Sequence, residues 1–195
     1  MMSVSATEEI ASAAARLVVD EGMEYAQAKR KAVRQLGLPR GRAELPSNEQ
    51  VEDEVRSHLA LFCADTQPAE LRALRQLALR WMERLAEFRP HLGGAVWRGT
   101  ATRLSAIHLD LYCDDPKAAE IALINQGIDY DVSGDGDDAV HYLSLADRCP
   151  GFSEPVTLFL AVRDLDDQRG ALKPDARGRS WRGDATALHK LLEAA

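Results

Sequence analysis

The chain has 195 residues, of which 46% are hydrophobic and 28% are charged, and its formal net charge is −7. These values are typical of a globular protein, and they exclude a disordered or collagen-like chain. No apolar run approaches the roughly 18 residues that a membrane span needs, and the N-terminal residues do not form a secretory signal. The acidic balance makes nucleic acid an unlikely partner for the surface as a whole. Three cysteines without a Cys-x-x-Cys pair predict neither a zinc site nor a disulfide framework, so we expect a cytoplasmic protein.

The first half of the sequence has the apolar spacing of helices. Ser5 and Ser47 are each followed three residues later by Glu or Gln, which is the capping-box pattern of a helix start. Gly22 and Gly37 are suitable helix ends. The pattern predicts four helices, at about 5–22, 23–36, 47–62 and 68–85. We therefore expect a helical module over residues 1–90.

The period changes near Gly93. Alternating and continuous apolar segments predict strands at 95–97, 107–112, 128–132, 141–145 and 155–162. Helices are predicted at 117–125 and 185–194, and a turn at 134–137. Residues 91–195 therefore form a mixed α/β domain in this interpretation, and the whole protein is predicted to be α+β.

One segment of the second half combines small residues with polar residues that alternate along a strand. Gly99-Thr100 follows an apolar segment, and a short polar loop leads to Ser105-Ala106-Ile107-His108-Leu109. This arrangement resembles the nucleotidyltransferase superfamily, in which a strand ends in Gly-Ser or Gly-Gly and a loop leads to Ser-Asp-Ile-Asp-Leu. The resemblance covers about residues 93–162.

The resemblance implies a nucleoside triphosphate as ligand and Mg²⁺ or Mn²⁺ as cofactor. In the superfamily, small residues admit the triphosphate, and carboxylates two apart on one strand hold two metal ions for in-line phosphoryl transfer. Carried over to this chain, Gly99, Thr100 and Ser105 would contact the nucleotide. Arg98 and Arg103 flank the Gly-Thr loop and would bind phosphate oxygens.

The metal-binding positions depart from the family pattern. In the direct alignment Ala106 and His108 replace the two aspartates. A second register makes His108 and Asp110 the metal pair and the catalytic residues, and a third puts Asp110 first and Tyr112 second. Imidazole is a poor substitute for a carboxylate at Mg²⁺.

The third acid of the family is also missing from its expected strand. Thr157 and Phe159 occupy the corresponding positions, and Asp131 is the nearest substitute as a metal ligand. We therefore expect a nucleotidyltransferase-like protein with a reduced site, in which nucleotidyl transfer is weak or absent. A retained pocket could still bind a nucleotide as a regulatory ligand.

Two other functions stay open from the sequence. The helical module could dock a protein partner, with the α/β domain as a scaffold and no enzymatic activity. The stretch 177–182 combines Arg179 and Arg182 with Trp181, a composition that could bind nucleic acid. An ordinary loop with Trp181 packed on the core is the alternative interpretation of that stretch.

Overall fold

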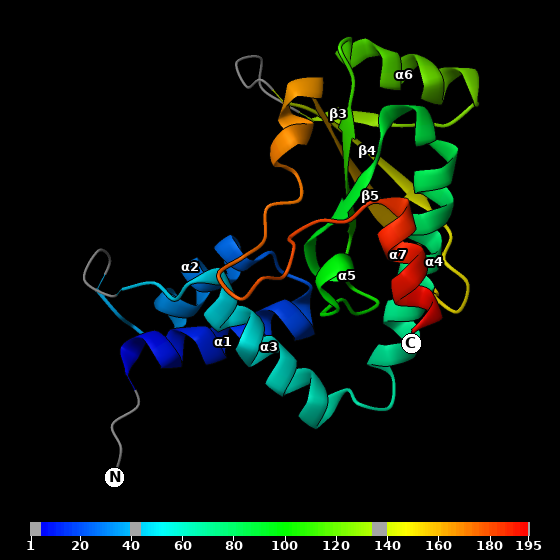
Figure 1. Cartoon of the computed structure of the whole chain (residues 1–195). Coiled ribbons are helices and arrows are strands. Elements are labelled where there is room, and N and C mark those ends of the chain that lie inside the picture. Colours follow the sequence, from blue (N-terminus) through cyan, green and yellow to red (C-terminus); the bar gives the residue numbers. More distant parts are fainter. Residues whose placement is uncertain (1–4, 40–43, 134–139, 195) are drawn as a thin grey trace. The chain divides into compact units, whose positions relative to one another are not determined.

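The computed structural model describes residues 5–39, 44–133 and 140–194. The chain divides into two compact units, Met1–Pro68 and Ala69–Ala195, and each is considered by itself (Figure 1). Helices precede a mixed five-stranded sheet, so the protein is α+β. None of the helices in the described residues is long and apolar enough to span a membrane.

The first unit is a cluster of three helices. They are α1 (Ala6–Glu21), α2 (Tyr25–Gln35) and α3 (Asn48–Phe62). Their apolar faces form a core of their own, built around Ile10, Val51 and Val55. Both predicted capping boxes are confirmed, because the Ser5 and Ser47 hydroxyls accept from the third residue of their helices and Glu8 and Gln50 complete the exchange.

The fourth helix belongs to the second unit. It is α4 (Gln67–Arg84), and its buried side chains, including Leu74, Leu77 and Met82, share a hydrophobic core with the sheet. The sequence placed the change of architecture near residue 90, whereas the compact units divide after Pro68. Local helical periodicity cannot show which core a helix will join, and this explains the difference.

The sheet has the strand order β1-β2-β5-β4-β3. β2 and β5 run parallel, and the other neighbouring pairs are antiparallel. The strands are β1 (His91–Gly93), β2 (Ile107–Tyr112), β3 (Asp131–Ser133), β4 (His141–Asp147) and β5 (Val156–Arg163). The remaining elements are η1 (Ala86–Phe88), α5 (Gly94–Arg98), α6 (Pro116–Asn125), η2 (Leu165–Gly170) and α7 (Ala185–Glu193).

One face of the sheet is covered by helices. Leu109 and Leu111 of β2 and Leu158 and Leu160 of β5 are buried in one cluster with residues of α4, α6 and α7. Burial of apolar area stabilises this arrangement by about 25 cal/mol per Å². The alternating residues of the strands lie on the opposite face, which carries the polar side chains described below.

The predicted strand at 95–97 is wrong. The strand β1 ends at Gly93, and residues Gly94–Arg98 form the short helix α5. Gly94 (φ 65°) and Gly99 (φ 86°) adopt left-handed backbone at its two ends, which glycine does without steric cost. Three apolar residues in a row fit a strand and a buried helical turn equally well, so the pattern alone could not decide.

One further element differs in extent. The third predicted strand, at 128–132, is shorter and begins at Asp131. The predicted turn at 134–137 lies outside the described residues.

The segment 174–183 is fixed to the start of the sheet. Gly183 and Leu92 exchange two backbone hydrogen bonds of 2.8 and 3.0 Å. A Cβ atom on Gly183 would lie only 2.0 Å from the Trp97 ring, so the indole packs directly on the glycine backbone. The Trp97 indole N–H donates to the Ser180 carbonyl at 3.0 Å.

This close packing predicts that Gly183→Ala destabilises the second unit. The added methyl group must displace the Trp97 ring or the backbone, and such overpacking costs about 1–3 kcal/mol. Urea unfolding followed by Trp fluorescence measures the change. Gly170→Ala is the control, because its Cβ would meet nothing closer than 4.0 Å. Equal stability of the two variants would contradict the packing described here.

Candidate functional site

The face of the sheet opposite α4, α6 and α7 carries a cluster of polar and aromatic side chains. On β2 these are His108, Asp110 and Tyr112, which alternate with buried leucines. The parallel register places Phe159 of β5 opposite His108 and Ala161 opposite Asp110. Cross-strand partners share a face of the sheet. The site is therefore a patch on one face, built mainly by two neighbouring parallel strands.

Asp110 lies at the centre of this patch and is only 8% exposed. Its Oδ1 is 3.1 Å from Nε of Arg163, at the end of β5, and its Oδ2 forms an ion pair with Nε of Arg182. A buried carboxylate is costly without partners of opposite charge. Two guanidinium groups against one carboxylate leave the cluster with one surplus positive charge, and both arginine side chains keep some solvent exposure, 25% and 36%.

Tyr112 is buried beside this cluster. Its ring meets His91 edge-on at a centroid distance of 5.3 Å. Burial, and then the nearby Asp110 carboxylate, raise the pKa of the Tyr112 hydroxyl above its ordinary value. Tyr112 is therefore a neutral hydroxyl at physiological pH and does not act as a base there.

His108 and Phe159 form an aromatic pair on the same face. Their rings are stacked at a centroid distance of 5.2 Å and an interplanar angle of 21°. The His108 ring also covers Gly94, where a Cβ would lie 3.3 Å from its Cδ2 atom. The glycine at the start of α5 thus admits the imidazole, and this contact brings the pair Gly93-Gly94 next to β2.

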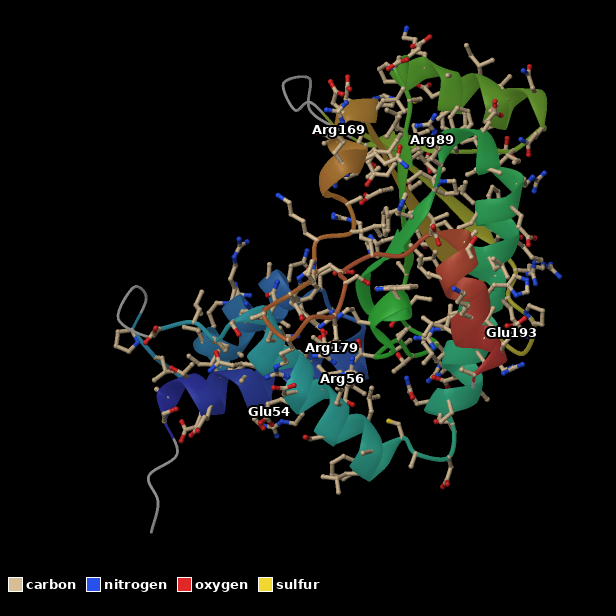
Figure 2. The ribbon with its side chains drawn as sticks, viewed as in Figure 1. Glu54, Arg56, Arg89, Arg169, Arg179 and Glu193 are labelled. Carbon is tan, nitrogen blue, oxygen red and sulfur yellow. The ribbon has the colours of Figure 1, made fainter. Side chains whose placement is uncertain are left out.

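Arg182 is held in place by the segment 174–183 around it. The Asp175 carboxylate, which has no exposed side-chain surface, accepts from Arg98 Nη2 at 2.9 Å. It also accepts from the backbone N–H groups of Arg177 and Arg179 at 2.9 and 2.8 Å. The Arg98 guanidinium lies 4.0 Å from the ring centroid of Trp181. Figure 2 shows Arg179 on this segment.

The backbone N–H groups of Gly99 and Thr100 in the predicted phosphate-binding loop are already used within the protein. The backbone N–H groups of Gly99 and Thr100 both donate to the Ala95 carbonyl at 2.9 Å. They lie after the C-terminal end of α5, where carbonyls rather than N–H groups are left over. We therefore do not place phosphates at Gly99-Thr100, and the glycine pair beside β2 is Gly93-Gly94 instead.

The other predicted nucleotide contacts are used within the protein. The Arg98 guanidinium is buried against Asp175 and Trp181 and does not face a ligand. Ser105 Oγ accepts from the Thr102 backbone N–H at 3.0 Å and closes its own loop. Arg103 is exposed, and its backbone N–H donates to Glu70 at 2.9 Å.

His108 and Asp110 share one face of β2, but the third predicted metal ligand is far from them. Asp131 is on β3, and β5 and β4 separate it from β2, a distance of roughly 14 Å at about 4.8 Å per strand. His108 faces Phe159, and Asp110 is already paired with two arginines. Within the described ranges, no group of three His, Cys, Asp or Glu residues could hold a metal ion. The residues present do not fit a two-metal centre.

Sequence reasoning missed three residues of the patch. Arg163 is the last residue of β5 and Arg182 lies far along the chain, so only the fold brings them to Asp110. Phe159 was noted as a missing acid and not as a ring. The sequence singles out the stretch 177–182 only as a nucleic-acid surface or an ordinary loop, and neither interpretation links Arg182 to Asp110.

Comparisons with known proteins find only distant similarity to solved structures. No family model and no curated protein matches the sequence. The chain is similar to two structures of the Cid1 poly(U) polymerase, a member of the nucleotidyltransferase superfamily. One is bound to MgGTP and has a TM-score of 0.39 at 14% identity, over 55% of this chain and 38% of that chain. The other holds the UTP analog UMPNPP, with a TM-score of 0.38 and 13% identity, over 55% and 36%. The chain spans less than two fifths of the length of either.

The contacts of Asp175 predict a specific pH dependence of stability. Its hydrogen bonds from the Arg179 backbone, and those from Arg98 and the Arg177 backbone, lower the pKa of its carboxyl below the ordinary 3.8 despite opposing burial. A lowered folded-state pKa stabilises the fold above the unfolded-state value, and this contribution is lost as pH falls through the folded-state pKa. Asp175→Asn should therefore melt below wild type at pH 7, and the gap should narrow below pH 3.8.

Thermal melts from pH 7 to pH 3 followed by circular dichroism measure this gap. Asp114→Asn, at an exposed position, is the control and should track wild type at every pH. A gap for Asp175→Asn that stays constant down to pH 3 would contradict the assigned role of the carboxylate.

Proposed function

We propose that this chain is a nucleotidyltransferase-like protein that binds a nucleotide without divalent metal and does not catalyse nucleotidyl transfer. The observation that carries the proposal is Asp110, held between Arg163 and Arg182 on the open face of the sheet. The carboxylate that a metal ion would need is neutralised by the chain's own cations.

The charge of the cluster supports binding of an anion. In metal-dependent transfer, two divalent ions neutralise the phosphates and stabilise the attacking and leaving oxygens. Here two guanidinium groups supply positive charge at fixed positions, and arginine donors match phosphate oxygens well. Within the described part of the chain, no group of three His, Cys, Asp or Glu side chains could hold the metal ions that activate the nucleophile in such transfer. Binding without transfer is the outcome we expect.

A second candidate is a protein-interaction role for the helical unit. Leu61 and Phe62, adjacent large apolar residues at the end of α3, are strongly exposed. Exposed apolar groups of this size are typical of contact surfaces when they form a patch. This candidate predicts no effect of nucleotides on stability.

The primary proposal predicts a metal-independent thermal shift. A nucleotide at a hundred times its dissociation constant stabilises the folded state by about 2.7 kcal/mol, which is about 5–10 °C for a domain of this size. We expect the same shift in EDTA and in Mg²⁺, and no labelled product with any acceptor. A shift that requires Mg²⁺ or Mn²⁺ would overturn the proposal, and no shift with any nucleotide would favour the helical-unit role.

Arginine variants locate the site. Arg182→Gln should abolish the nucleotide shift, because it removes one of the two guanidinium groups at Asp110. Arg179→Gln, on the same segment, should retain it. Thr100→Val tests the predicted Gly-Thr loop and should also retain the nucleotide shift. The substitution breaks no hydrogen bond within the protein, since the buried Thr100 hydroxyl has no partner there. Loss of the shift in Thr100→Val with retention in Arg182→Gln would place the ligand at the loop instead.

A further inference from the structure

A shallow depression lies over β3, β4 and β5, and neither His108 nor Phe159 is among the residues that line it. It has a volume of about 360 Å³ and is lined by Asp131, Ser144, Thr157 and neighbouring residues of β3, β4 and β5. This volume is at the lower end of the range of small-molecule sites. Ser144 is the cross-strand partner of Phe159 on one side and of Asp131 on the other. The depression therefore begins where the small Ser144 side chain leaves room beside the Phe159 ring.

The Phe159 ring is placed to stack on a flat ligand. It is 37% exposed, and His108 stacks against it from β2. Side chains stand roughly perpendicular to a sheet, so the side of the ring away from His108 looks over Ser144. Tyr142, 38% exposed, is diagonal to Phe159 on β4, about 7–8 Å away. An exposed ring beside a small residue is suited to a planar aromatic group.

The depression also offers hydrogen-bond acceptors. The Asp131 carboxylate and the Ser144 hydroxyl line it, and a carboxylate only accepts hydrogen bonds. A base that presents amino N–H groups suits these acceptors. The ring surface and the acceptors together favour an aminopurine over uracil.

Arg163 and Arg182, the two arginines paired with Asp110, lie on the same face of the sheet, on the side of Phe159 toward the end of β5. Asp110, which holds both guanidinium groups, pairs with Ala161, and Ala161 pairs with Tyr142 on the other side. The small Ala161 side chain thus lies between the Phe159 ring and the arginines, and Phe159 and Ala161 are two residues apart on β5, about 7 Å. A ribose spans a separation of this kind between a base and its 5′-phosphate.

The local charge sets the number of phosphates. Arg163 and Arg182 less Asp110 leave a surplus of one positive charge. The helix η2 contacts β2 and begins with acidic residues, Asp164, Asp166 and Asp167. A triphosphate would bring several negative charges toward these carboxylates, whereas a single phosphate, with a charge of about −1.5 to −2, brings the fewest.

We propose, building on the proposed function, that this face binds a purine nucleoside 5′-monophosphate. The base stacks on Phe159 and extends over Ser144 toward the depression, and the phosphate lies on Arg163 and Arg182. The ligand is held without metal. Position 159, at which the resembled family carries an acid, here serves base recognition.

Calorimetric titration of the full chain in EDTA tests the proposal with AMP, ribose 5-phosphate, UMP and ATP. Base stacking on an aromatic side chain changes affinity by about 10-fold or more. We expect AMP to bind at least about 10-fold more tightly than ribose 5-phosphate, and more tightly than UMP and ATP. Phe159→Ala should reduce AMP affinity to that of ribose 5-phosphate and leave ribose 5-phosphate binding unchanged. Phe159→Trp should retain AMP binding.

Leu104→Ala, an exposed apolar residue of the Gly-Thr loop, is the matched control and should bind AMP as wild type does. Equal affinity for AMP and ribose 5-phosphate, or wild-type AMP affinity in Phe159→Ala, would overturn the base site and leave the metal-free nucleotide site intact. Tighter binding of ATP than of AMP would overturn the assignment of a monophosphate. Absence of binding by all four ligands would overturn this inference and the proposed function together.

Discussion

The buried ion pair between Arg98 and Asp175 is the interaction on which the arrangement of the site depends. Both side chains are almost fully buried, and breaking such a pair by removing one partner is strongly destabilising, because the other charge is left uncompensated. The pair holds the segment 174–183 against α5 and β1, and this segment carries Arg182. Without it, Asp110 would lose one of its two cations. The residue that supplies the site with charge is therefore positioned by a contact that lies outside the site.

The same architecture underlies our proposal that the chain binds a nucleotide without divalent metal. The Asp110 carboxylate is paired with two arginines, and a divalent cation would have to displace one guanidinium group and approach the other. The neighbouring positions offer no help, because Ala106 and Phe159 carry no ligand atoms. What remains is a surface with fixed positive charge beside exposed rings, and this combination suits binding of an anion with an aromatic group better than catalysis.

Much of the fold could be predicted from local pattern. The capping boxes, the apolar spacing of α1 to α4 and the alternation along β2 are properties of adjacent residues, and the structure confirms them. The helix α5 could not be distinguished from a strand, because three apolar residues fit either structure. The site was predicted only in part. His108 and Asp110 were found by their alternation, but Arg163 and Arg182 reach Asp110 through the parallel pairing of β2 with β5 and the return of segment 174–183, which no local pattern encodes.

The long-range contacts of segment 174–183 also influence the order in which the two units fold. Arg98 and Asp175 are 77 positions apart in the sequence, and Trp97 and Ser180 are 83 apart. Contacts of such long range form late and slow the search for the native state. The helices α1 to α3 make contacts among neighbours and can complete their core early, since the N-terminal part of a chain emerges first during synthesis. In contrast, the partners Asp175 of Arg98 and Arg182 of Asp110 are synthesised only when almost all of the described chain has been made. The sheet unit is therefore the part of the protein most exposed to misfolding and to chaperones.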